Sequence, residues 1–205
     1  MNLQEMLQYR MEKLWKKLEA QMIQSYESMV RDDGDVTAWN QAFDTLMKIV
    51  ESGRREKHNF APELFCLSGM EGFSFDLKIW INDYLETLEQ AQMEKVCRKL
   101  LDLFAWKEEA PADLRFRLAS SMLSLDKKEE AGDFCREWYL QDEDDPTAAT
   151  ALIYTWIAGG RLKEAQKIVD RWMEKEEGYT EDNAEIFGAA SLLRTVSGNI
   201  SVERN

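Results

Sequence analysis

Residues 146–179 read PTAATALIYTWIAGGRLKEAQKIVDRWMEKEEGY, with two helix-like runs on either side of Gly159 and Gly160. The first run begins at Asp145 and Pro146. Aspartate can cap a helix N-terminus, and proline suits the first helical turn because the N–H that it lacks would have no partner there. Glycine ends helices readily because it adopts the left-handed backbone conformation. The stretch therefore predicts a helical hairpin.

The same pattern recurs every 34 residues from about residue 75 onward. Cys97, Ala131 and Ala165 align at this period. Four more positions are apolar in all three copies: Tyr84, Leu118 and Leu152; Leu88, Met122 and Trp156; Leu101, Cys135 and Val169; and Phe104, Trp138 and Trp172. We expect each copy to divide into two helices, at Gln92, at residues 126–127 and at residues 159–161. Because such repeats bury their apolar faces only against neighbours, the pattern predicts a stack of hairpins.

This period resembles that of the tetratricopeptide repeat, a helix-turn-helix unit of 34 residues. Gly160-Arg161-Leu162-Lys163-Glu164-Ala165 is similar to the turn and the small second-helix residue of that family. The resemblance covers residues 78–179 and implies a right-handed α-α solenoid. Where the family has a small residue late in the second helix, the three copies carry Phe104, Trp138 and Trp172. These bulky side chains predict wider helix spacing than in the family.

Upstream of the repeats, apolar residues follow the periodicity of helices. A stripe at steps of three and four predicts a long helix over residues 3–30, formed by Leu3, Leu7, Met11, Leu14, Leu18, Met22, Tyr26 and Met29. A second helix is expected over residues 36–52, with Trp39, Phe43, Leu46 and Val50 on one side. Residues 53–73 form an irregular joint with one short helix. The stripe drifts from a strict heptad, so we expect the first helix to fold back onto the protein.

Together these patterns predict an all-α fold of two domains. An N-terminal helical lobe occupies residues 1–73, and a tetratricopeptide-like repeat region occupies residues 74–200. The repeat region ends in a capping helix that is expected to begin with an N-cap within residues 180–183. This helix runs to about Val196 and buries Ile186, Phe187, Ala190 and Leu193. Only 3 Pro and 10 Gly are present, in keeping with long helices and few turns.

The resemblance also implies where a ligand would bind, because tetratricopeptide ligands lie in a concave groove lined by the first helices. Transferred position by position, the lining here is Ile79, Asn82, Glu86, Glu89, Asp113, Phe116, Arg117, Ser120, Leu123, Thr147, Thr150, Tyr154 and Ile157. One end of this set is acidic and the other is uncharged. The groove would therefore suit a protein or peptide segment with a basic end and an apolar end.

Charge and composition exclude several classes of partner. The chain carries 26 Lys and Arg against 39 Asp and Glu, a net charge of −13, and a nucleic-acid-binding surface would need a basic patch. The longest uncharged run, residues 146–160, is 15 residues long, and a helix needs about 20 apolar residues to span a bilayer. The N-terminal residues show no apolar core of a secretory signal. We expect a cytoplasmic protein that binds neither nucleic acid nor membrane.

No pattern in the chain predicts catalysis, a cofactor or a metal. His58 is the single histidine, and no Cys-x-x-Cys, His-Glu-x-x-His or glycine-rich phosphate loop occurs. Three widely spaced cysteines, Cys66, Cys97 and Cys135, indicate reduced thiols rather than a disulfide framework. The favoured interpretation is a non-enzymatic adaptor that binds a segment of another protein.

Two alternatives stay open at this stage. A small-molecule sensor or enzyme would have a pocket between the N-terminal lobe and the repeats, lined by Phe60, Phe65, Met70 and Phe73, with His58 and Cys66 nearby. A homo-oligomeric structural subunit would instead use residues 3–30 as a dimer seam.

Overall fold

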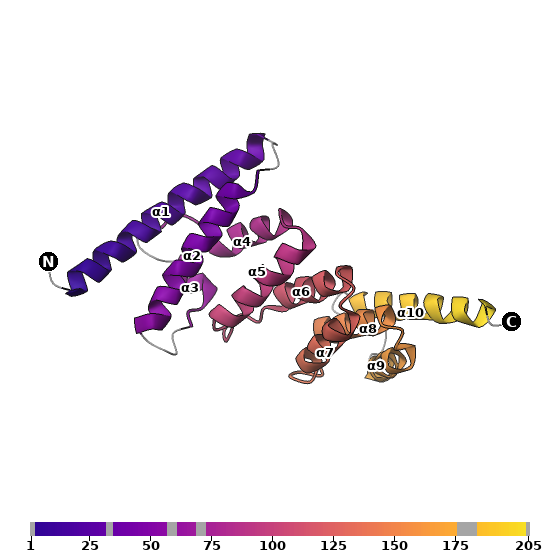
Figure 1. The fold of residues 1–205 in the computed structure, drawn as a ribbon. Coiled ribbons are helices and arrows are strands. Elements are labelled where there is room, and N and C mark those ends of the chain that lie inside the picture. Colours follow the sequence, from indigo (N-terminus) through magenta and orange to yellow (C-terminus); the bar gives the residue numbers. More distant parts are fainter. Residues whose placement is uncertain (1–2, 32–34, 57–60, 69–72, 176–183, 204–205) are drawn as a thin grey trace. The chain divides into compact units, whose positions relative to one another are not determined.

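The computed structural model describes residues 3–31, 35–56, 61–68, 73–175 and 184–203, with the backbone alone given for residues 3–10, 31, 56, 175 and 199–203. Within these ranges the chain forms ten helices and no strand, which confirms the all-α class (Figure 1). The helices are α1 (Leu3–Arg31), α2 (Thr37–Glu56), α3 (Leu64–Ser68), α4 (Leu77–Glu86), α5 (Gln90–Leu103), α6 (Ala112–Ser124), α7 (Lys128–Tyr139), α8 (Pro146–Ala158), α9 (Leu162–Lys175) and α10 (Ala184–Glu203).

Contacts divide the chain into two compact units. The N-terminal unit comprises Met1–Glu89 and Arg98–Ala110, and the C-terminal unit comprises Gln90–Cys97 and Pro111–Asn205. The sequence placed a boundary after residue 73 and assigned α4 to the repeats. By its contacts α4 belongs to the N-terminal unit, because Trp80 and Tyr84 stack on Trp39 of α2 with ring centroids 5.4 and 6.2 Å apart.

In the N-terminal unit α1 lies along α2 (Figure 1). The predicted apolar side of α2 is buried over its whole length, and Leu18 and Met22 of α1 are fully buried. The expected folding back of the first helix is therefore confirmed. Towards its C-terminal end the stripe differs from the prediction, since Ser25 and Ser28 are buried while Met29 is 61% exposed.

Buried polar groups in this unit are hydrogen-bonded to one another. The Trp80 Nε1–H donates to Ser25 Oγ at 3.1 Å, and the Ser25 hydroxyl donates to the Met22 carbonyl at 2.7 Å. The Tyr84 hydroxyl donates to Asn40 Oδ1 at 2.7 Å, and burial raises the pKa of Tyr84 to about 12. An unpartnered polar group would be costly here, so these bonds favour one specific packing of α1, α2 and α4.

Three predicted boundaries were wrong. The helix expected over residues 36–52 continues to Glu56. The turn expected at Gln92 lies at residues 87–89, because the Thr87 N–H and hydroxyl both bond the Tyr84 carbonyl and close α4 early. The last helix does not end near Val196 but continues to Glu203 through Ser197 and Gly198. Its expected N-cap, residues 180–183, lies outside the described residues.

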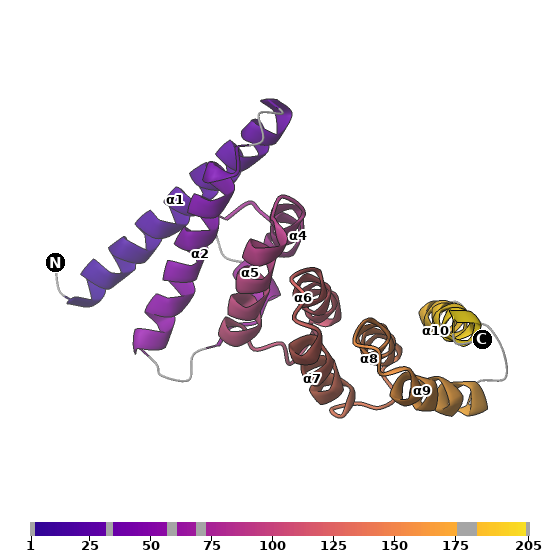
Figure 2. The same ribbon diagram turned by 45° about the vertical axis from the view of Figure 1, so that its right-hand side comes forward.

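The C-terminal unit has two rows of helices. Figure 2 shows α6, α8 and α10 in one row and α7 and α9 in the other, and α8 contacts α6, α7, α9 and α10. The three positions that defined the period, Cys97, Ala131 and Ala165, are each fully buried within α5, α7 and α9. The other repeat positions are buried as well, except Leu101, which is half-buried. The recurring apolar residues therefore form the core.

Two turns in this unit have the same geometry, 34 residues apart. After α6, the Lys127 N–H bonds the Met122 carbonyl at 2.9 Å and Asp126 is left-handed, with φ of 59°. After α8, the Arg161 N–H bonds the Trp156 carbonyl at 2.7 Å and Gly160 is left-handed, with φ of 74°. Both are Schellman turns, in which a left-handed residue lets the chain reverse directly after a helix. The α6–α7 and α8–α9 hairpins are thus equivalent at their turns.

Helix α10 covers the end of the row formed by α6 and α8. Ile186, Ala189, Ala190 and Leu193 are buried in a cluster that includes Ala149, Leu152 and Ile153 of α8. Phe187, expected on the buried face, is half-buried. The alanines let α10 approach α8 closely, because they add little side-chain bulk between the two helices.

Candidate binding surface

A pocket of about 340 Å³ lies between α6 and α8 of the C-terminal unit. Its lining comes from two first helices of neighbouring hairpins: Phe116, Ala119, Ser120 and Leu123 from α6, and Ala151, Tyr154 and Thr155 from α8. The small side chains of Ala119 and Ala151 leave space between the helices, while Phe116, Leu123 and Tyr154 are half-buried at the surface. Pockets that hold small ligands in proteins begin at about 300 Å³, so this one has room for one large side chain or one small molecule.

The pocket has no charged wall. Helix α8 contains no charged residue, whereas half the residues of α7 and of α9 are charged. Eight of the 13 residues of α8 are buried, which accounts for most of this difference. However, its partly exposed residues Thr147, Tyr154 and Ile157 are uncharged as well. Apolar and hydroxyl groups therefore dominate what α8 presents to solvent.

Three residues of the pocket lining carry a hydroxyl group, and one of these hydroxyls is already used in a hydrogen bond. The Thr155 hydroxyl donates to the Leu152 carbonyl at 2.9 Å, and Cys135 forms a hydrogen bond with Thr155 from below. In the described part of the chain, no hydrogen bond joins the hydroxyl of Ser120 or of Tyr154 to another group. The Tyr154 hydroxyl lies 3.8 Å from the place that a Cβ at Gly188 of α10 would occupy.

The cysteine beneath the pocket is not suited to nucleophilic chemistry. Burial raises the pKa of the Cys135 thiol to about 12, so the thiol is neutral at physiological pH. Cys97 has the same property, with its pKa raised to about 12 by burial. Both behave as small apolar residues of the core, as their repeat positions predicted.

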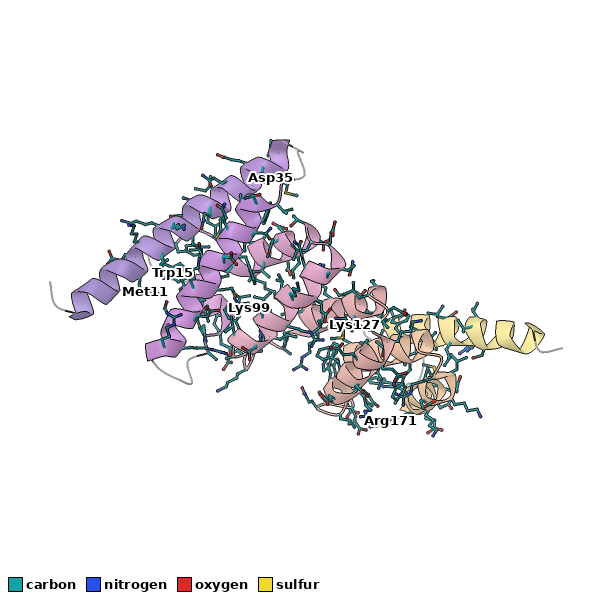
Figure 3. The ribbon with its side chains drawn as sticks, viewed as in Figure 1. Met11, Trp15, Asp35, Lys99, Lys127 and Arg171 are labelled. Carbon is teal, nitrogen blue, oxygen red and sulfur yellow. The ribbon has the colours of Figure 1, made fainter. Side chains whose placement is uncertain are left out.

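Acidic residues of the loop before α8 are engaged in structural contacts. Arg171 of α9, labelled in Figure 3, pairs with Glu143 and lies over the Tyr139 ring, with 5.9 Å to its centroid. The Asp145 side chain caps α8 by accepting bonds from Thr147 N and Ala148 N at 2.9 and 3.2 Å. No group of three or more candidate metal ligands occurs among the residues that the structure describes.

Four of the predicted groove residues in this unit line the pocket: Phe116, Ser120, Leu123 and Tyr154. Asp113, Arg117, Thr147 and Ile157 are partly or fully exposed but do not line it. Thr150 is only 1% exposed, so its side chain is not available to a ligand. The transfer from the family missed Ala119, Ala151 and Thr155, whose small or buried side chains resemble ordinary core residues.

The remaining predicted groove residues belong to the N-terminal unit. Ile79, Asn82, Glu86 and Glu89 are all exposed, Ile79 by 57%. Lys78 beside Ile79 pairs with Glu109. Two of these four exposed residues, Glu86 and Glu89, are acidic, and a groove that they would help to line stays a prediction.

The alternative site near the joint is only partly described. His58, Phe60 and Met70 lie outside the described residues. Phe73 packs edge-on against Trp15 with ring centroids 4.9 Å apart, while Phe65 and Cys66 are exposed. Phe73 is therefore part of the packing of α1, and a site formed by the whole set stays a prediction.

Comparisons with protein-family models, curated proteins and solved structures found no match for this chain. Among the described helices, none combines the length and the apolar character that crossing a membrane requires.

Proposed function

We propose that this protein is a non-enzymatic adaptor that binds a segment of another protein on the α6–α8 surface of its C-terminal unit. The observation that carries the proposal is the α6/α8 pocket, which combines apolar walls, the unbonded hydroxyl of Ser120 and no charged lining. Apolar pockets of this size anchor single side chains at protein interfaces, where a few residues supply most of the binding free energy.

The proposal includes a tetratricopeptide-like solenoid in the cytoplasm. Its support is the 34-residue equivalence of the turns at Asp126 and Gly160, together with the buried period-defining residues. Stacked hairpins present an extended surface on one row of helices, and such surfaces commonly bind peptides without any chemistry. The buried, neutral thiols of Cys97 and Cys135 also favour binding over catalysis.

A selection from a displayed library of random peptides against the full chain tests this function. Ser120→Phe places a ring in the pocket from an exposed position, so the fold should be retained. We expect selected peptides to bind this variant about tenfold or more weakly, the loss typical of a blocked anchor. Ser124→Phe is the matched control, because Ser124 is exposed on the same helix but does not line the pocket. If no selected peptide distinguishes the two variants, the proposed function is wrong.

A further inference from the structure

We propose that the α6/α8 pocket takes a tryptophan or tyrosine side chain from the partner segment, and that basic residues flank this anchor. The inference rests on the proposed function and narrows it to one class of ligand. It follows from three features: the walls of the pocket, the Ser120 hydroxyl, and the net charge of the unit around it.

The walls select a large, flat apolar group. Phe116 and Tyr154 face the pocket from different helices with Leu123 beside them, and Ala119 and Ala151 leave space between these side chains. Aromatic rings favour edge-to-face or offset contacts with other rings, worth about 0.5–1.5 kcal/mol beyond the area that they bury. A charged anchor would lose its hydration without gaining a partner, since no charged side chain lines the pocket.

The Ser120 hydroxyl selects an aromatic group that has a polar edge. Ser120 lines the pocket from α6, and no hydrogen bond joins its hydroxyl to another group within the described part of the chain, whereas the Tyr154 hydroxyl lies beside Gly188 of α10 and leaves its ring to the pocket. An indole N–H or a phenol O–H can bond to such a group, whereas a phenylalanine or leucine side chain cannot. Tryptophan and tyrosine are also enriched at interfaces because they combine an apolar body with one polar group.

The net charge of the C-terminal unit favours basic residues beside the anchor in the partner segment. The C-terminal unit carries 13 Lys and Arg against 20 Asp and Glu, a net charge of −7. Such an excess attracts basic segments and repels acidic ones over several ångströms, which mainly changes the association rate. Since the pocket itself is uncharged, we expect salt to slow association while the dissociation rate stays nearly constant.

Amide NMR of the full chain tests the anchor with four probes: the N-acetyl amides of tryptophan, tyrosine, phenylalanine and leucine. We expect the first two to bind more tightly and to shift the resonances of Ser120, Leu123 and Tyr154. Ser120→Ala removes the hydroxyl that lines the pocket, so it should weaken these two probes about threefold to tenfold and leave the phenylalanine probe unchanged. Tyr154→Phe is the matched control, because its hydroxyl lies beside Gly188 of α10, and it should change the binding of all four probes little. Equal binding of all four probes, or binding that Ser120→Ala does not alter, would overturn the inference.

The peptide selection separates failure of this inference from failure of the proposed function. Peptides that lose binding in Ser120→Phe, and that carry Trp or Tyr beside Lys or Arg, support both. Ser120-dependent peptides with aliphatic anchors or acidic flanks overturn the inference and leave the function standing. If the tryptophan probe binds but no Ser120-dependent peptide emerges, both are wrong, and the pocket serves a small aromatic molecule instead.

Discussion

At the scale of single residues, the two Schellman turns of the C-terminal unit differ in how well their residues suit them. Asp126 and Gly160 occupy the same turn position with φ of 59° and 74°. Left-handed geometry brings Cβ close to the carbonyl that follows it, at a cost of about 1–2 kcal/mol for most residues. Glycine avoids this cost, and aspartate tolerates the geometry better than most. The α6–α7 turn is therefore the more strained of the two.

Substitutions at these two positions should change the free energy of unfolding in opposite directions. We expect Gly160→Ala to lower the free energy of unfolding by about 1–2 kcal/mol, because no heavy atom near the new Cβ offers compensating contact. Asp126→Gly should raise it by about 0.5–1 kcal/mol. Urea unfolding followed by circular dichroism measures both changes.

Gly132→Ala serves as the control for these two variants. Gly132 is helical, and a Cβ there would meet the Trp156 ring at an ordinary 3.6 Å. Because alanine is a better helix former than glycine, we expect stabilisation of up to about 1 kcal/mol. If Gly160→Ala were as favourable as Gly132→Ala, the left-handed turn would not exist in solution.

At the scale of elements, the helices start in two different ways. Asp76 and Asp145 each accept two backbone N–H bonds at the N-termini of α4 and α8. Glu89 and Lys127 precede α5 and α7, and neither side chain caps its helix with a hydrogen bond. The N–H groups of a first helical turn have no partner within their own helix, so a capping side chain stabilises the helix.

Removing a cap should therefore be costly only where the cap is formed. We expect Asp145→Ala to lower the free energy of unfolding by about 0.5–2 kcal/mol. Asp145→Asn should lose only a small part of this amount, because asparagine also caps helices. Glu89→Ala, the control, should change the free energy of unfolding by less than about 0.5 kcal/mol. Thermal and urea unfolding of the three variants provide the measurement, and equal losses for Asp145→Ala and Glu89→Ala would contradict the capping geometry.

At the scale of the whole molecule, both units bury tyrosine or cysteine side chains, which become negatively charged in alkali. Burial raises the pKa of Tyr84 to about 12 in the N-terminal unit, and those of Cys97 and Cys135 to about 12 in the C-terminal unit. The pKa of Tyr26 is also raised, by burial and by its hydrogen bond to Asp83. In the unfolded chain these groups lose their protons at lower pH.

The protein should therefore lose stability in alkali. Above pH 9 to 10 the unfolded chain binds fewer protons than the folded one, so the free energy of unfolding falls as pH rises towards about 12. Each such group contributes a slope of up to about 1.4 kcal/mol per pH unit. Urea unfolding at several pH values measures the slope.

The double variant Cys97→Ala/Cys135→Ala isolates the thiols in this measurement. Its stability should fall less steeply between about pH 9 and pH 12 than that of the original chain, whatever its stability at neutral pH. Parallel curves for the two proteins would show that these thiols are not buried in solution.

The spacing of apolar residues predicted most of the helices, because buried positions recur every three or four residues along a helix. The positions aligned with Ala131, Leu118 and Trp138 are buried in every copy. The turn near Gln92 was misplaced because the 34-residue period was extended to a hairpin whose turn carries no left-handed residue. In the same way, Met29 continued the apolar stripe of α1, although the buried positions there belong to serines.

The local pattern of this chain was sufficient to predict helices, their approximate ends and the residues of the core, because these depend on spacing and on the chemistry of individual side chains. The pocket required the packed structure. Ala119 and Ala151 look like core residues in the sequence, and they leave a pocket only because α6 and α8 lie side by side with Phe116 and Tyr154 at the rim. The space between two helices depends on side chains from both, and the spacing within either one does not reveal it.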